Sequence, residues 1–194
     1  MDLAEIVSFA MGNIEPTPDL AGVPAYRCAA HLKDGLYLPC VLLRATNPQI
    51  DLALRRFAET ATDEERREQE RKTLLRRLFA TAVPFGLTGI VKTFVATGNR
   101  FNSWHLDRIE PSPFALPPAR LQEIQGETRM GWTQFVGVMM DGKEFSFGTT
   151  YHTHFFEMPT GYAATDVARI IPGEAGTGRT YRERPFFECF IDGA

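Results

Sequence analysis

The feature that most restricts the fold of this 194-residue chain is an Asp-Gly pair at residues 34–35, which separates two apolar segments. Asp followed by Gly tolerates the positive φ angles of a two-residue type I′ turn, the commonest connection in a β-hairpin. Pairing residues outward from that turn gives the apolar pairs Leu32–Tyr37, Ala30–Pro39, Cys28–Val41 and Tyr26–Leu43. A shift by one residue would move every side chain to the other face. The sequence therefore predicts a hairpin over 25–44.

A second Asp-Gly pair, at 141–142, predicts a hairpin over 132–156 by the same reasoning. The expected opposite pairs are Val138–Phe145, Val136–Phe147, Trp132–Tyr151 and Phe135–Gly148. Opposite residues share a face of the sheet, so aromatic side chains of this hairpin are expected to pack into a core. A Gly-Asn pair at 98–99 predicts a third hairpin, over 89–109.

Between the first and third hairpins the pattern is helical. Asn47 followed by Pro48 is typical of a helix start, with Asn as the N-cap. Thr62 and Glu65 form a capping box that starts a second helix, expected over 62–82. The first half of this second helix is polar on all sides, so we expect it to face solvent or a protein partner.

These elements predict an α+β fold: an antiparallel sheet built from three hairpins, with a two-helix layer at about 48–82 packed on one face. The length fits a single globular domain over 1–194. Within it, residues 1–24 are expected to form an irregular lead-in, because prolines follow one another closely there. Hydrophobic residues make up 44% and charged residues 23% of the chain, which excludes a disordered or collagen-like protein.

The charge and the cysteines restrict the partners and the compartment. Lys and Arg number 21 against 24 Asp and Glu, a net charge of −3, so no general attraction to nucleic acid or to an anionic membrane is expected. The three cysteines are widely spaced, without a CxxC pair, and the N-terminus lacks the basic region of a secretory signal. We therefore expect a cytoplasmic protein with reduced cysteines.

The segment His152-Thr153-His154 is the strongest candidate for a functional site. Histidines two apart on a strand point to the same face, and imidazole suits zinc or iron. Asp166 is the expected third ligand, with Glu157 as the alternative. The same histidines also fit the solvent-facing side of an amphipathic strand, which needs no metal.

Two family motifs are similar to this segment. The first metal motif of the cupins is similar, with shorter intervals, to the set Gly148, His152, His154, Glu157 and Gly161. The pattern His152-x-His154 followed by Asp166 is similar to the zinc motif of the MPN-type metalloproteases, although Ala163 stands where that family has Ser. The second resemblance implies a zinc-bound water that cleaves an amide.

Two functions follow from these patterns. The polar half of the helix 62–82, together with the sheet surface, favours a non-catalytic protein-binding or interaction domain that needs no cofactor. The alternative is a metal-dependent hydrolase or oxygenase, with zinc or iron held by His152, His154 and Asp166 or Glu157.

Overall fold

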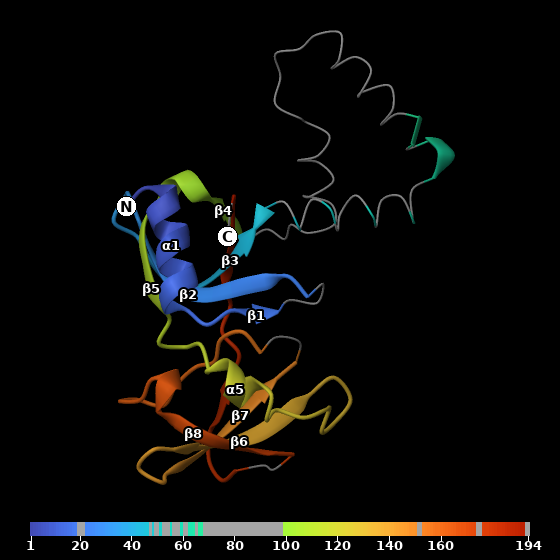
Figure 1. The fold of residues 1–194 in the computed structure, drawn as a ribbon. Coiled ribbons are helices and arrows are strands. Elements are labelled where there is room, and N and C mark those ends of the chain that lie inside the picture. Colours follow the sequence, from blue (N-terminus) through green and yellow to red (C-terminus); the bar gives the residue numbers. More distant parts are fainter. Residues whose placement is uncertain are drawn as a thin grey trace.

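The computed structural model of the protein describes residues 1–18, 22–46, 48, 51, 55, 59, 62–64, 66–67, 99–150, 153–173 and 176–192. Within these residues it names two α-helices, two 3-10 helices (η) and ten strands (Figure 1). In chain order they are α1 Leu3–Asn13, β1 Thr17–Pro18, β2 Pro24–Leu32, β3 Tyr37–Ala45, β4 Arg100–Asn102, η1 Ser103–His105, β5 Leu106–Pro111, α5 Pro118–Leu121, β6 Thr133–Met139, β7 Glu144–Thr149, η2 Ala164–Asp166, β8 Val167–Pro172, β9 Thr180–Arg182 and β10 Phe187–Ile191.

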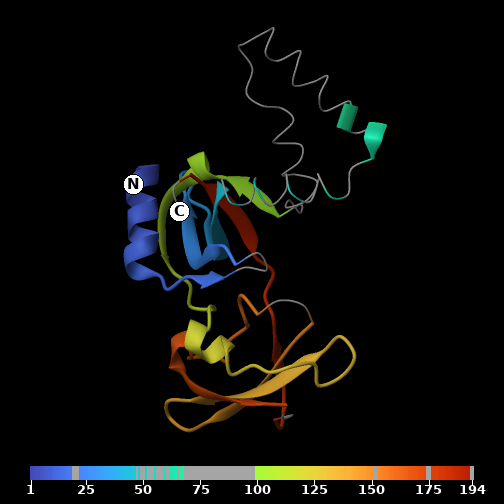
Figure 2. The same cartoon turned by 45° about the vertical axis from the view of Figure 1, so that its right-hand side comes forward.

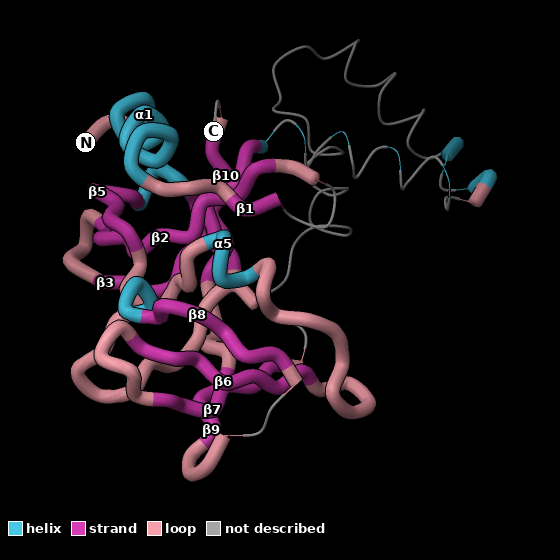
Figure 3. Tube along the Cα trace, turned by 60° about the horizontal axis from the view of Figure 1, so that its bottom comes forward, coloured by secondary structure: helices cyan, strands magenta, loops and turns pink. Residues whose placement is uncertain are grey.

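The strands form two sheets, one above the other in Figure 1. The six-stranded sheet has the order β1-β2-β3-β10-β4, and β5 also pairs with β2. The four-stranded sheet has the order β8-β6-β7-β9, which can be followed in Figure 3. The chain builds the four-stranded sheet between β5 and β10, so both chain ends lie at the six-stranded sheet (Figure 1).

Both sheets are mixed. Strand β10 pairs in parallel with β3 and β4, and β9 pairs in parallel with β7, whereas the other pairs of named strands are antiparallel. The expected combination of helices and sheets is confirmed, but the purely antiparallel sheet is wrong. Parallel strands need long connections, and no turn signal in the sequence indicates which segments they join.

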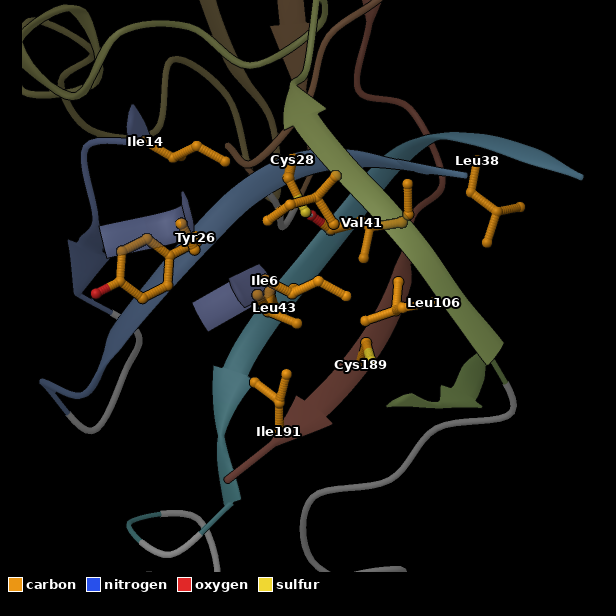
Figure 4. Close-up of a cluster of buried hydrophobic side chains, with 13 residues drawn as sticks. Ile6, Ile14, Tyr26, Cys28, Leu38, Val41, Leu43, Leu106, Cys189 and Ile191 are labelled. Carbon is orange, nitrogen blue, oxygen red and sulfur yellow. The ribbon is translucent and has the colours of Figure 1, made fainter. Parts of the chain in front are cut away.

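The six-stranded sheet is strongly curved around its core. Strand β4 pairs with β10, β5 pairs with β2, and only the three residues of η1 join β4 to β5. Strand β5 therefore crosses in front of β3 and β10, and Leu106 packs over Val41 and Cys189 (Figure 4). Helix α1 lies beside β5 (Figure 2) and adds the fully buried Ile6 and Ala10 to this core.

The irregular lead-in expected over 1–24 differs from the structure, because α1 occupies Leu3–Asn13. Its start is a capping box: the Asp2 side chain accepts a hydrogen bond from the Glu5 backbone N–H, and the Glu5 carboxylate accepts one from the Asp2 N–H, both at 2.8 Å. The prolines on which the expectation depended begin at position 16, after the helix has ended.

The first hairpin is confirmed, but its turn has three residues rather than two. The Gly35 N–H donates to the Leu32 carbonyl at 2.9 Å, and the Leu32 N–H donates to the Leu36 carbonyl at 2.8 Å. Gly35 has a φ of 89°, but Asp34 has no positive φ, so a type I′ turn is not formed. The extra turn residue displaces the pairing near the turn by one residue.

A bulge in β3 restores the predicted register. Ala30 pairs with Leu38 instead of the expected Pro39, whereas beyond Pro39 the predicted pairs Cys28–Val41 and Tyr26–Leu43 are confirmed. Proline has no N–H to donate to a neighbouring strand, so its position at an irregularity fits its chemistry.

The second hairpin has the same three-residue turn and no compensating bulge. Gly142, with a φ of 84°, donates to the Met139 carbonyl at 2.9 Å. The three expected pairs within the described residues are therefore displaced by one, and Phe135 lies opposite Phe147 rather than Gly148. The fourth expected pair, Trp132–Tyr151, is not tested, because Tyr151 lies outside the described residues. Strand β7 also ends at Thr149, so the strand expected to continue to 156 is wrong.

Two other expectations fall largely outside the described residues. The first strand of the hairpin 89–109 lies there, and η1 divides its expected second strand into β4 and β5. Most of the helix pair at 48–82 also lies there, so its packing on a sheet stays a prediction. The residues described between 48 and 67 are helical, apart from Thr62.

Each sheet has its own hydrophobic core. In the four-stranded sheet the rings of Phe135 and Phe147 stack with centroids 5.4 Å apart, and Phe156 meets Phe135 edge-on at 5.4 Å. The single domain over 1–194 stays a prediction. All three cysteines are free and buried, and no helix among the described residues is long and apolar enough to cross a membrane.

Candidate functional site

The predicted metal site is only partly described, because His152 lies outside the described residues. His154 follows β7 in irregular chain, so the alternation of strand side chains no longer applies to it. Its carbonyl accepts a hydrogen bond from Arg27 Nη1 at 3.3 Å, and its ring packs edge-on against Phe186 with centroids 5.0 Å apart. Both contacts are with the six-stranded sheet, because Arg27 lies in β2 and Phe186 directly precedes β10.

Both acids expected as the third ligand have protein partners. Asp166 Oδ2 accepts a hydrogen bond from the Ala163 N–H at 2.7 Å and so closes the η2 turn. Glu157 forms an ion pair with Arg179 at 2.8 Å. Within the described part of the chain, no group of three or more His, Cys, Asp or Glu could hold a metal ion. The site at His152, His154 and Asp166 stays a prediction.

A different candidate site begins at the tight turn before β6. Arg129 and Trp132 form an antiparallel bridge, in which the Trp132 N–H donates to the Arg129 carbonyl at 2.9 Å. Gly131, with a φ of 68°, allows the two-residue turn. Met130 at its tip is fully exposed. The turn therefore presents an arginine, a methionine and a tryptophan close together.

The Trp132 indole rests on Gly148 of the neighbouring strand β7. A β-carbon at position 148 would lie 2.7 Å from Trp132 Cη2 and 2.8 Å from Cε2, inside van der Waals contact. Only glycine leaves room for the ring. Gly148 was expected to lie opposite Phe135, and the aromatic ring that covers it is instead that of Trp132.

Strand β9 supplies the second cation of the site. Its parallel register with β7 sets Arg182 opposite Gly148, and Arg182 Cζ lies 4.9 Å from the centroid of the Trp132 ring. An arginine at this distance from an indole is held by a cation–π interaction. Arg129, Trp132, Thr180 and Arg182 line an open groove of about 410 Å³. We call it the Trp132 groove.

A hydrogen-bonded row of side chains supports the groove. Gln134 Nε2 donates to Ser146 Oγ at 3.3 Å, and Ser146 Oγ lies 3.3 Å from Thr180 Oγ1. Ser146 is fully buried. The row joins β6, β7 and β9 and holds Thr180 in place at the edge of the groove.

The groove carries two positive charges that the described residues do not neutralise. Arg129 and Arg182 are both exposed, and neither forms an ion pair with any residue that the structure describes. The nearby Glu183 is engaged elsewhere: burial raises the pKa of its carboxyl, but hydrogen bonds from Thr150 outweigh burial and hold the pKa below its usual value.

The arrangement suits an acidic group beside an apolar contact. A guanidinium presents a planar fork of donors that matches a carboxylate or phosphate. No family model, no curated protein and no solved structure matches the chain. Sequence reasoning missed the groove because three separate segments build it. The one available signal was that Trp132 and Gly148 belong to the same predicted hairpin.

Proposed function

We propose that the protein is a non-catalytic binding protein that docks an acidic segment of a polypeptide partner in the Trp132 groove. The observation that carries the proposal is the pair of exposed guanidinium groups, Arg129 and Arg182, beside the half-buried Trp132. Carboxylates of the partner would receive hydrogen bonds from these groups, and its apolar atoms would lie against the exposed Met130.

An acidic polypeptide fits this groove better than a nucleic acid does. Single-stranded nucleic acid is held on aromatic rings whose faces are free to stack with bases. The Trp132 ring is instead packed against Gly148 and Arg182.

Binding of a short fluorescein-labelled oligoglutamate peptide, measured by fluorescence anisotropy, tests the proposal. The double variant Arg129→Gln, Arg182→Gln is expected to bind at least tenfold more weakly, because a hydrogen bond to a charged group contributes about 1.5–3 kcal/mol. Arg179→Gln is the matched control, since that guanidinium is already paired with Glu157. Failure of the wild type to bind the peptide, or equal binding by the double variant, would overturn the proposal.

The polar half of the helix 62–82 is the second docking surface that we propose for a protein partner. Arg66 and Arg67 are helical and exposed, and the Arg66 N–H donates to the Thr62 carbonyl at 3.0 Å. The positive charge of these two residues suits an acidic partner, as that of the groove does.

A further inference from the structure

The side chains that support the Trp132 groove form a hydrogen-bonded chain that has a direction. Gln134 Nε2 can only donate, so it gives a hydrogen to Ser146 Oγ, which lies 3.3 Å away. Ser146 Oγ in turn lies 3.3 Å from Thr180 Oγ1, at a position where either hydroxyl could be the donor. The surroundings of Ser146 decide between these two directions.

Ser146 is fully buried within β7. Gly176, in the loop before β9, lies directly on it: a β-carbon at position 176 would be 3.1 Å from Ser146 Cβ and 3.3 Å from Ser146 N. A buried hydroxyl hydrogen without an acceptor costs free energy, because water does not replace the missing partner. Among the described residues Thr180 Oγ1 is the acceptor available to this hydrogen, so Ser146 donates to Thr180.

Thr180 therefore keeps its own hydroxyl hydrogen for a ligand. Thr180 is half-buried and lines the groove together with Arg129 and Arg182. Its hydroxyl makes no second hydrogen bond with any residue that the structure describes. The turn before β6 and the strand β9 thus present three donor groups to one groove, two guanidinium groups and one hydroxyl.

Two further acidic residues lie near the groove, and neither neutralises it. The Glu157 N–H donates to the Arg182 carbonyl at 2.8 Å, but the Glu157 carboxylate pairs with Arg179. Glu127, two residues before Arg129, is exposed and forms no ion pair within the described part of the chain. An acidic ligand therefore meets both guanidinium groups without a competing carboxylate from the described residues.

A phosphoryl group satisfies these donors more completely than one carboxylate does. A carboxylate has two oxygens in one plane and carries a single negative charge. The phosphoryl group of a phosphorylated side chain has three strong acceptor oxygens and, at pH 7, a charge of about −1.5 to −2. Two guanidinium groups match that charge, and the three oxygens give the Thr180 hydroxyl an acceptor as well.

We propose that the Trp132 groove binds a phosphorylated side chain of its polypeptide partner, with Arg129, Arg182 and the Thr180 hydroxyl as donors to the phosphoryl oxygens. This inference rests on the proposed function, because it names the acidic group that the same groove receives. A nucleotide fits less well than a peptide, because Gly148 and Arg182 pack against the indole and a base needs a free ring face.

Fluorescence anisotropy of the full chain with two labelled peptides tests the inference. One is the oligoglutamate peptide with a central phosphoserine, and the other has two glutamates in place of the phosphoserine, so the two charges nearly match. The wild type is expected to bind the phosphoserine peptide at least about tenfold more tightly, since hydrogen bonds to charged groups are the strong ones. Equal affinity overturns the inference but leaves the docking of an acidic segment standing. Failure to bind either peptide overturns both.

Thr180→Val tests the hydroxyl itself. It is expected to weaken binding of the phosphoserine peptide about tenfold, because one hydrogen bond to the phosphoryl group is lost. Thr180→Ser keeps a hydroxyl and is expected to restore the wild-type Kd. Thr177→Val is the matched control, since Thr177 is exposed and does not line the groove. Wild-type affinity in Thr180→Val overturns the proposal. If Thr180→Val does not fold, the comparison of the two peptides on the wild type decides.

Competition separates a phosphorylated side chain from free phosphate. The unlabelled phosphoserine peptide is expected to displace the labelled one at a concentration at least about tenfold lower than inorganic phosphate does at equal ionic strength, because the peptide also contacts the exposed Met130. Inorganic phosphate that competes equally well would assign the groove to free phosphate and would overturn the polypeptide source.

Discussion

Trp132, in the turn before β6, packs directly on Gly148 of the strand β7: the indole occupies the space that a β-carbon at 148 would need. This contact sets the position of the ring in the groove. It also explains why a glycine interrupts the otherwise bulky sequence of β7. The groove is thus a product of sheet packing, because the ring is held by the neighbouring strand as well as by its own turn.

Gly148→Ala is expected to destabilise the protein by about 1–3 kcal/mol, because the added methyl group must displace the indole. Urea unfolding measures the change. Gly12→Ala in α1 is the control, since no atom lies within 4 Å of its added β-carbon. The control is expected to gain up to about 1 kcal/mol, since alanine is the better helix former. Equal stability of wild type and Gly148→Ala contradicts the contact.

Thr150→Val is expected to lower the free energy of unfolding by about 1 kcal/mol at neutral pH, because the ionised Glu183 loses the bond from the threonine hydroxyl. The folded-state pKa of Glu183 lies below its usual 4.5. The ionised Glu183 therefore contributes its full share to the free energy of unfolding above about pH 4.5. This contribution is lost as the pH falls through the folded-state pKa. The difference in the free energy of unfolding between Thr150→Val and the wild type should therefore become smaller as the pH falls. A difference that grows below pH 4.5 would contradict a lowered pKa for Glu183.

Metal analysis tests the alternative function, a metal-dependent hydrolase or oxygenase centred on His152 and His154. Protein purified without a His-tag is expected to contain less than stoichiometric zinc or iron, and chelation is expected to leave its Tm unchanged. Stoichiometric metal that is lost in the double variant His152→Ala, His154→Ala would instead establish the metal-dependent alternative.

Charge reversal distinguishes the two docking surfaces that we propose. If the acidic partner binds in the Trp132 groove, Arg66→Glu with Arg67→Glu should leave oligoglutamate affinity within about twofold at physiological salt, since neither residue lines the groove and salt screens exposed charges. Loss of binding in this variant, with an unchanged Tm, would assign docking to the helix 62–82.

The hairpins show how far the sequence determines this fold. Asp-Gly correctly located both turns, but the same dipeptide fits a two-residue type I′ turn and a three-residue turn with glycine last. Within each of these two turns only the glycine adopts a positive φ, at Gly35 and at Gly142, so the longer turn formed in both cases. In the first hairpin a bulge in β3 restored the predicted pairs, whereas in the second every described pair was displaced.

The Trp132 groove could not be predicted in the same way. Arg129 and Trp132 are local to one turn, but Arg182 reaches them through the parallel pairing of β7 with β9, across more than thirty residues of chain. The position of Glu188 opposite Leu42 depends likewise on β10 joining β3 in parallel. Hydrophobic alternation fixes which face of a strand is buried, but it does not specify which distant strand becomes the neighbour.

Tryptophan emission tests the central claim most directly. The chain has two tryptophans, and Trp104 is 62% exposed, so Trp104→Phe leaves Trp132 as the single reporter. Titration of this variant with oligoglutamate peptide is expected to change the Trp132 emission saturably, with a midpoint that matches the Kd from anisotropy. Peptide binding that leaves the Trp132 emission unchanged would place the acidic partner elsewhere on the protein.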